Sequence, residues 1–163
     1  MISPKSSGVR PTSDKVRSAI FSKIYDKIDN ANVLDLFAGT GAFGIEAISR
    51  GANFVTFIDK DVSTLIKNVK LLEKNNYEII KRDIFQGLKK VNKKYDIVFI
   101  DPPYGKINSK DIMQCLKEYQ TIAKDGVLIY EESIRTEFQI DEGFKLIDSK
   151  RYGDTIIYYL ELE

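Results

Sequence analysis

Four consecutive residues, Asp101-Pro102-Pro103-Tyr104, suit chemistry on an amino group attached to an aromatic base. Such a nitrogen is a poor nucleophile, because its lone pair is delocalised into the ring. An Asp101 carboxylate and a proline carbonyl can accept its two hydrogens and favour a more tetrahedral nitrogen. Prolines fix φ at about −65° and donate no N–H, so a carbonyl of the turn can face a substrate. Tyr104 offers a flat face for a base taken out of its stack.

A glycine-rich run, Gly39-Thr40-Gly41-Ala42-Phe43-Gly44, precedes this motif and matches G-x-G-x-x-G. Glycines let a backbone approach a ligand closely, and Asp59, at the next expected strand end, suits ribose hydroxyls. Nicotinamide dinucleotides and S-adenosylmethionine (SAM) both carry such a ribose. Three features favour SAM: Asp35 suits an ammonium group, Asp83-Ile84 suits an adenine, and the Asp-Pro-Pro-Tyr motif suits methyl transfer.

Alternating apolar runs and helical patterns predict the elements that position these residues. The expected strands are 33–37, 54–58, 77–80, 95–100 and 127–130. The expected helices are 14–28, 43–50, 62–72, 84–90 and 109–123. Ile66 in one helix, and Tyr119 and Ile122 in another, are expected on buried faces.

This alternation predicts an α/β fold with a mostly parallel sheet and helices on both faces. Asp59, Asp83 and Asp101 each follow a strand, so they would line the carboxyl edge, where such folds bind ligands. Two β-rich segments, 144–151 and 155–162, flank a turn at Gly153-Asp154 and predict an antiparallel hairpin closing the sheet. We expect a single domain over residues 1–163, with residues 1–30 as a segment and helix packed on it.

The composition excludes several catalytic classes. The 163 residues include no histidine and one cysteine, and the net charge is +1. A Ser-His-Asp triad, a Cys-His pair and a histidine metal site are therefore excluded, and we expect no metal. The lone Cys115 is compatible with a reducing compartment, and no stretch reaches the ~18 apolar residues of a spanning helix. We expect a cytoplasmic monomer without a membrane partner.

The charge is unevenly distributed. Residues 1–30 carry six bases against three acids, and residues 81–94 carry six bases against one acid. Residues 125–163 carry four bases against ten acids. Such asymmetry can present a basic face to a polyanion, although solvated surface charges explain it equally well.

These motifs together resemble the class I SAM-dependent methyltransferases that act on amino nitrogens. The resemblance rests on residues 33–47, Asp59, Asp83 and 101–104. Residues 8–12, together with Asp14, Val16-Arg17, Phe21 and residues 44–51, resemble more narrowly the RsmD-type family of bacterial 16S rRNA guanine-N2 methyltransferases. Many members carry Glu where this chain has Asp59.

The resemblance implies a Rossmann-like, seven-stranded sheet and methyl transfer from SAM to N2 of a guanine in 16S rRNA, free or within a small-subunit assembly particle. By position, it implies two sets of site residues. The expected cofactor-binding residues are Asp35, Ala38, Gly39, Thr40, Gly41, Asp59, Lys60, Asp83 and Ile84. The expected catalytic residues are Asp101, Pro102, Pro103 and Tyr104, and Arg10 and Arg17 are expected near RNA phosphate.

Three alternatives stay open on sequence alone. An adenine-N6 methyltransferase acting on DNA or RNA would use the same four-residue motif. A nicotinamide-dependent oxidoreductase would use the same glycine motif. A non-catalytic RNA-binding assembly factor would keep only the fold.

Overall fold

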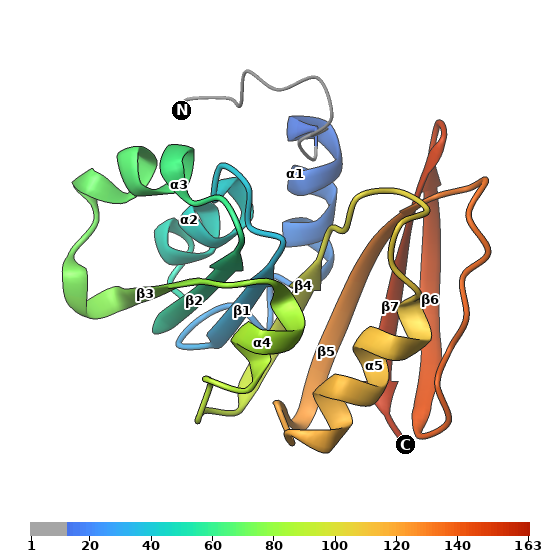
Figure 1. Cartoon of the computed structure of the whole chain (residues 1–163). Coiled ribbons are helices and arrows are strands. Elements are labelled where there is room, and N and C mark those ends of the chain that lie inside the picture. The colour runs from blue at the N-terminus through green and yellow to red at the C-terminus, as the bar shows by residue number, and fades with distance from the viewer. Residues whose placement is uncertain (1–12) are drawn as a thin grey trace.

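A seven-stranded sheet forms the centre of the protein in the computed structural model, which describes residues 13–163 (Figure 1). The strands are β1 (Asn32–Leu36), β2 (Phe54–Asp59), β3 (Tyr77–Lys81), β4 (Tyr95–Ile100), β5 (Ile122–Ser133), β6 (Phe144–Tyr152) and β7 (Thr155–Leu162). The helices are α1 (Asp14–Lys23), α2 (Ala42–Ser49), α3 (Ser63–Asn68), α4 (Ile84–Leu88) and α5 (Ser109–Glu118). Two short 3-10 turns, Val69–Leu71 and Lys74–Asn76, follow α3.

The strand order is β3-β2-β1-β4-β5-β7-β6. Strands β1 to β5 pair in parallel, whereas β7 is antiparallel to both β5 and β6. The predicted mostly parallel sheet with an antiparallel C-terminal hairpin is therefore confirmed. The order reverses at β1, and sheets of this kind bind ligands beyond the carboxyl ends of the strands at such a reversal, which here are β1 and β4.

Apolar side chains cover both faces of the sheet, because successive residues of a strand point to opposite sides. One buried cluster joins Val33 and Phe99 to residues of α1, α2 and α3, such as Phe43. The other joins Leu34 and Ile100 to residues of α4 and α5. Helices thus cover both faces, as predicted, with α4 and α5 in front of the sheet in Figure 1.

The predicted boundaries of α5 and β5 are wrong. Ile122 was expected in the helix, but α5 ends at Glu118 and Ile122 pairs with Tyr95 as the first residue of β5. Gln120, with a φ of 50°, reverses the chain between the two elements. Tyr119, expected on the inner face, is instead 36% exposed, because it lies at the C-terminus of α5.

Two other helices are shorter than expected. Helix α1 ends at Lys23, yet Ile24 and Ile28 beyond it are buried, so the expected apolar stripe is confirmed without a continuous helix. Helix α3 changes to a 3-10 turn after Asn68, and Ile66 is 48% exposed rather than buried. None of the helices among residues 13–163 is long and apolar enough to span a membrane.

Candidate active site

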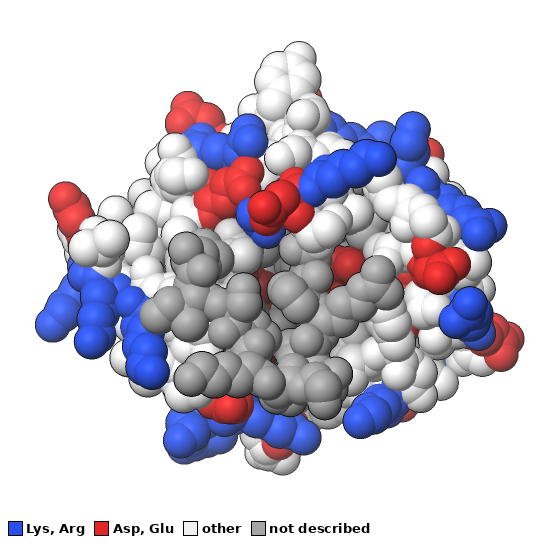
Figure 2. All heavy atoms as spheres, turned by 90° about the horizontal axis from the view of Figure 1, so that it is seen from above, with Lys and Arg blue, Asp and Glu red and all other residues white. Residues whose placement is uncertain are grey.

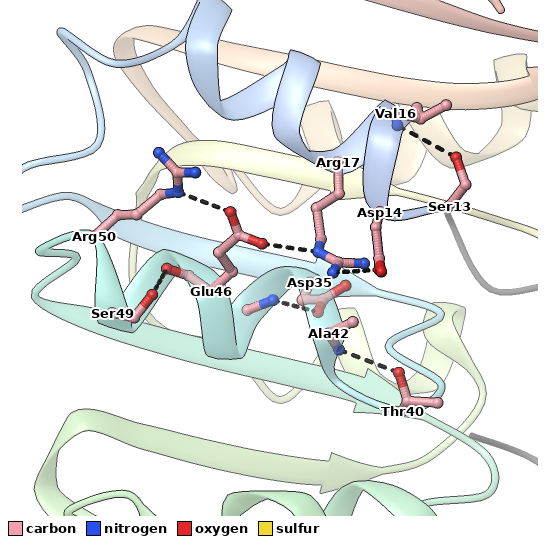
Figure 3. Close-up of polar contacts among 11 residues, drawn as sticks. Ser13, Asp14, Val16, Arg17, Asp35, Thr40, Ala42, Glu46, Ser49 and Arg50 are labelled. Carbon is pink, nitrogen blue, oxygen red and sulfur yellow. Dashed lines mark hydrogen bonds and ion pairs between the residues drawn. The ribbon is translucent and has the colours of Figure 1, made fainter. Parts of the chain in front are cut away.

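Asp35 is a buried carboxylate inside β1, beneath the first turn of α2 (Figure 3). Its Oδ2 accepts the Gly44 N–H at 3.1 Å, which satisfies one of the amide groups that a helix N-terminus leaves unpaired. Burial raises the pKa of the Asp35 carboxyl well above its usual range; the Gly44 N–H opposes this shift and the charge of Asp59 adds to it. A cation brought beside Asp35 would therefore be strongly favoured.

The glycine-rich loop turns sharply where β1 ends. The Gly41 N–H donates to the Ala38 carbonyl at 2.8 Å, and the Ala38 N–H donates to the Ile58 carbonyl of β2 at 3.2 Å. Gly39 and Gly41 have φ values of 57° and 82°, a conformation that favours glycine. Among residues 13–163, a Cβ on Gly39 would meet nothing closer than the Phe37 carbonyl oxygen at 3.9 Å, so these residues leave room for a ligand there.

Asp59 ends β2 and reaches back to this loop. Its Oδ2 accepts the Gly39 N–H at 2.7 Å. Asp59 and the loop, twenty residues apart in sequence, therefore lie together at the carboxyl edge of the sheet.

Asn68 supports the same loop and was missed by the sequence analysis. Its Nδ2 donates to the Thr40 carbonyl at 2.9 Å, and Thr40 Oγ1 accepts the Ala42 N–H at 3.3 Å. Thr40 is buried, and these two hydrogen bonds stabilise the conformation of the loop. No local pattern marked Asn68, because the contact joins residues 28 positions apart.

The expected adenine-binding residues lie at the start of α4. Asp83 is the N-cap residue, and its Oδ1 accepts the N–H groups of Phe85 at 3.0 Å and Gln86 at 3.2 Å. Ile84 is buried in the cluster that α4 and α5 share. Lys60, expected to contact the cofactor, is exposed just beyond β2.

The Asp-Pro-Pro-Tyr motif leaves the sheet beside the glycine-rich loop. The Asp101 N–H lies 3.5 Å from the Leu36 carbonyl, which links the end of β4 to the end of β1. Pro102 is buried and Pro103 is exposed. The Pro103 carbonyl accepts the Lys106 N–H at 3.3 Å. The turn thus occupies one proline carbonyl and leaves that of Pro102 as the better candidate for a substrate contact.

Strand β5 adds carboxylates that the sequence analysis missed. Glu131 and Glu132, expected beyond the strand, are 4% and 1% exposed. Burial raises the pKa of Glu132, and Oε1 of this residue accepts the Ser133 N–H at 2.8 Å. Burial also raises the pKa of Tyr130, and the charges of Glu132 and Asp101 add to that shift, so these groups share one end of the sheet. The sequence feature that could have indicated these residues is the pair of acids directly after the apolar run 127–130.

Arg17, expected to contact RNA, joins α1 to α2 (Figure 3). Its Nε donates to Glu46 Oε1 at 2.9 Å, and its Nη2 donates to Asp14 Oδ1 at 2.8 Å. The Arg17 side chain is 15% exposed. Phosphate contact by Arg17 stays a prediction, and Arg10 lies outside the described residues.

The basic stretch 81–94 does not form one patch. Lys81 ends β3, at the carboxyl edge. Lys93 lies 4.4 Å from the ring centre of Phe54, the first residue of β2, at the opposite edge. Figure 2, seen from above Figure 1, shows Lys and Arg side chains in separate places with Asp and Glu between them.

Comparisons with known proteins match nearly the whole chain to one family. A protein family described as "Conserved hypothetical protein 95" matches residues 1–161. Ribosomal RNA small subunit methyltransferase D of Buchnera aphidicola is 38% identical over 146 residues, which cover 87% of this chain and 76% of that protein. The protein of the same name from Escherichia coli K12 is 37% identical over 133 residues, covering 80% of this chain and 67% of its own length.

A solved structure shows the same fold. The putative methyltransferase yhhF from Escherichia coli superposes with a TM-score of 0.86 at 28% identity, covering 99% of this chain and 91% of that one. The family match spans nearly the whole sequence, and the fold and motifs agree with it. This chain therefore belongs to the family described as Conserved hypothetical protein 95, the RsmD family.

Proposed function

We propose that this protein transfers a methyl group from SAM to the exocyclic N2 of a guanine in the 16S rRNA of the small ribosomal subunit. The substrate is the rRNA, free or within an assembly particle. The observation that carries the proposal is the hydrogen bond between the Asp101 N–H and the Leu36 carbonyl. It sets the base-amine motif directly beside the strand that holds Asp35 and leads into the glycine-rich loop.

The residues at the end of β1 and β2 fit SAM. The Gly39 backbone leaves room for a close ligand, and the Asp59 carboxylate, which accepts the N–H groups of Gly39 and Asp61, would also accept ribose hydroxyls. Asp35, with its raised pKa, favours a neighbouring ammonium group, and Asp83 at the start of α4 would accept the adenine amino group. SAM supplies an electrophilic methyl group on a sulfonium.

The residues after β4 prepare the nucleophile. Asp101 and the Pro102 carbonyl accept the two hydrogens of the guanine amino group, which turns its lone pair out of conjugation. Tyr104 presents a flat face to the base. After methyl transfer the amino nitrogen releases one proton, to the Asp101 carboxylate or to water. Preorganised acceptors of this kind contribute on the order of 10²–10³ in rate each.

A methylation assay with tritiated SAM tests the proposal. Undermodified small subunits, naked 16S rRNA and DNA are each incubated with the protein, digested to nucleosides and separated. We expect the label in N2-methylguanosine from small-subunit RNA. Label in N6-methyladenosine would instead support the adenine methyltransferase.

A binding measurement accompanies the assay. SAM and its demethylated product should raise the melting temperature of the protein, whereas NAD and NADH should leave it unchanged. Stabilisation by a nicotinamide dinucleotide alone would support the oxidoreductase. Absence of methyl transfer to every substrate would overturn the proposed activity and favour a non-catalytic assembly factor.

A further inference from the structure

The hydroxyl of Tyr104 is held by two strands that lie outside the Asp-Pro-Pro-Tyr motif. Its Oη lies 3.1 Å from Thr155 Oγ1 and donates to Glu131 Oε1 at 3.5 Å. Glu131 belongs to β5 and Thr155 is the first residue of β7. Thr155 is 5% exposed and Glu131 is 4% exposed, whereas Tyr104 is half-buried, so both contacts are partly shielded from water.

The register of the two strands explains why these side chains meet. Glu131 pairs with Ile157, and Thr155 lies two residues before Ile157. Residues two apart in a strand point to the same side, so Glu131 and Thr155 face the same side of the sheet. The antiparallel β7, which begins at Thr155, thus extends the site beyond the parallel strands.

The chemistry of the three groups sets the direction of each hydrogen bond. The Tyr104 O–H donates to Glu131 Oε1. Because a phenol carries a single hydrogen, the Tyr104 oxygen accepts in its contact with Thr155, and the Thr155 hydroxyl donates to it. The hydroxyl end of the Tyr104 ring is therefore hydrogen-bonded to both β5 and β7, while its backbone belongs to the turn after β4.

We propose that Thr155 is a positioning residue, which together with Glu131 holds the Tyr104 ring in the orientation that receives the target base. This proposal rests on the proposed function, because Tyr104 matters for methyl transfer only if a base lies against it. A ring fixed before the base arrives needs no reordering in the reaction, and small misplacements of such groups lower reaction rates strongly.

The test is a set of variants measured by single-turnover methyl transfer at saturating SAM and RNA. Thr155→Val removes the donor and should slow transfer about three- to tenfold, the size of one lost hydrogen bond, with SAM affinity unchanged. Thr155→Ser keeps the hydroxyl and should restore most of the rate. In a Tyr104→Phe background, Thr155→Val should cause little further loss, because the accepting oxygen is already absent.

The chain offers a matched control in Thr56. Its Oγ1 donates to Glu78 Oε1 at 2.9 Å and lies 2.6 Å from Tyr95 Oη, so it makes the same kind of threonine, tyrosine and glutamate contact. Thr56 lies in the middle of β2, buried away from the carboxyl edge. Thr56→Val should lower the melting temperature but leave the transfer rate of the folded protein unchanged.

A stability cycle provides a readout independent of activity. Melting temperatures of Thr155→Val, Tyr104→Phe and the double variant should show that the two changes are not additive. Equal slowing by Thr155→Val in the wild-type and Tyr104→Phe backgrounds would overturn the positioning role. Wild-type rates in both single variants, with Asp101→Ala inactive, would also overturn it while leaving the proposed function intact. If the wild-type protein methylates no substrate, the proposed function fails and the positioning role fails with it.

Discussion

The Asp59 carboxylate accepts the backbone N–H of Gly39 at 2.7 Å, so one side chain joins the end of β2 to the glycine-rich loop after β1. This hydrogen bond fixes the loop at Gly39. The other oxygen of the same carboxylate accepts the Asp61 N–H at 3.4 Å. We predict that Asp59 also binds the ribose of the cofactor, so that one residue would hold both the loop and the ligand.

Substitution of Asp59 should therefore weaken SAM binding. Asp59→Asn keeps the size but loses the charge, and we expect affinity to fall about ten- to a hundredfold, as for a lost charge-assisted hydrogen bond. Asp59→Glu should retain most of the affinity, since it keeps the carboxylate. Calorimetric titration with SAM measures both. The neighbouring exposed Asp61, whose Oδ1 accepts the N–H of Ser63 at 3.0 Å, is the control, and Asp61→Asn should bind SAM normally.

Gly41 should tolerate no side chain. It has a φ of 82°, and a Cβ there would lie 2.3 Å from Leu65 Cδ1. Gly41→Ala should lower the free energy of unfolding by about 1–3 kcal/mol, from backbone strain and overlap, and should abolish SAM binding. Gly153 has a φ of 62°, and no atom of the described part of the chain lies within 4 Å of a Cβ added there, so Gly153→Ala measures the backbone strain alone. Urea unfolding should show a smaller loss for Gly153→Ala; equal losses would contradict the packing argument.

Asp35 should make stability depend on pH. Burial raises its pKa in the folded protein above the unfolded value of about 3.9, so the folded state binds a proton more tightly. The contribution of Asp35 to stability is full below the unfolded pKa and is lost as the pH rises through the raised pKa. Without SAM, Asp35→Asn should thus unfold at a higher temperature than wild type at neutral pH, and this difference in melting temperature should decrease towards pH 4. A difference that did not change with pH would contradict the raised pKa of Asp35. The same variant should bind SAM weakly.

Arg17 should stabilise the packing of α1 on α2. It shares Glu46 with Arg50, whose Nε donates to Glu46 Oε2 at 2.7 Å. The Arg17 side chain is 15% exposed and that of Arg50 is 42% exposed, so solvent screens the second pair more. Arg17→Ala should destabilise the protein more than Arg50→Ala in chemical unfolding. Unchanged stability with weakened RNA binding would instead assign Arg17 to phosphate contact.

Much of the fold could be predicted because its strands are short apolar runs ended by acids or glycines. Asp35, Asp59 and Asp101 each lie where the sequence predicts relative to a strand end, and the glycine-rich run lies between β1 and α2 as expected. Both features can be recognised from neighbouring residues in the sequence. Their meeting at one edge follows from the right-handed connections between parallel strands.

The remainder depends on tertiary contacts that local patterns do not specify. Thr155 and Tyr104 are 51 residues apart, and Glu131 and Tyr104 are 27 apart; only the pairing of β5 with β7 brings them together. Ile66 was assigned to the core by periodicity, but α3 ends two residues later and the stripe loses its continuity. The ends of helices and strands depend on tertiary contacts as well as on the local sequence, so the local pattern alone does not predict them.

The most direct test of the account is methyl transfer by Asp101→Ala. Labelled SAM and undermodified small subunits measure the rate, and the rise in melting temperature with SAM measures cofactor binding. We expect transfer to fall at least about a hundredfold while the stabilisation by SAM is unchanged. A variant that transferred methyl groups at the wild-type rate per bound SAM would contradict the central claim.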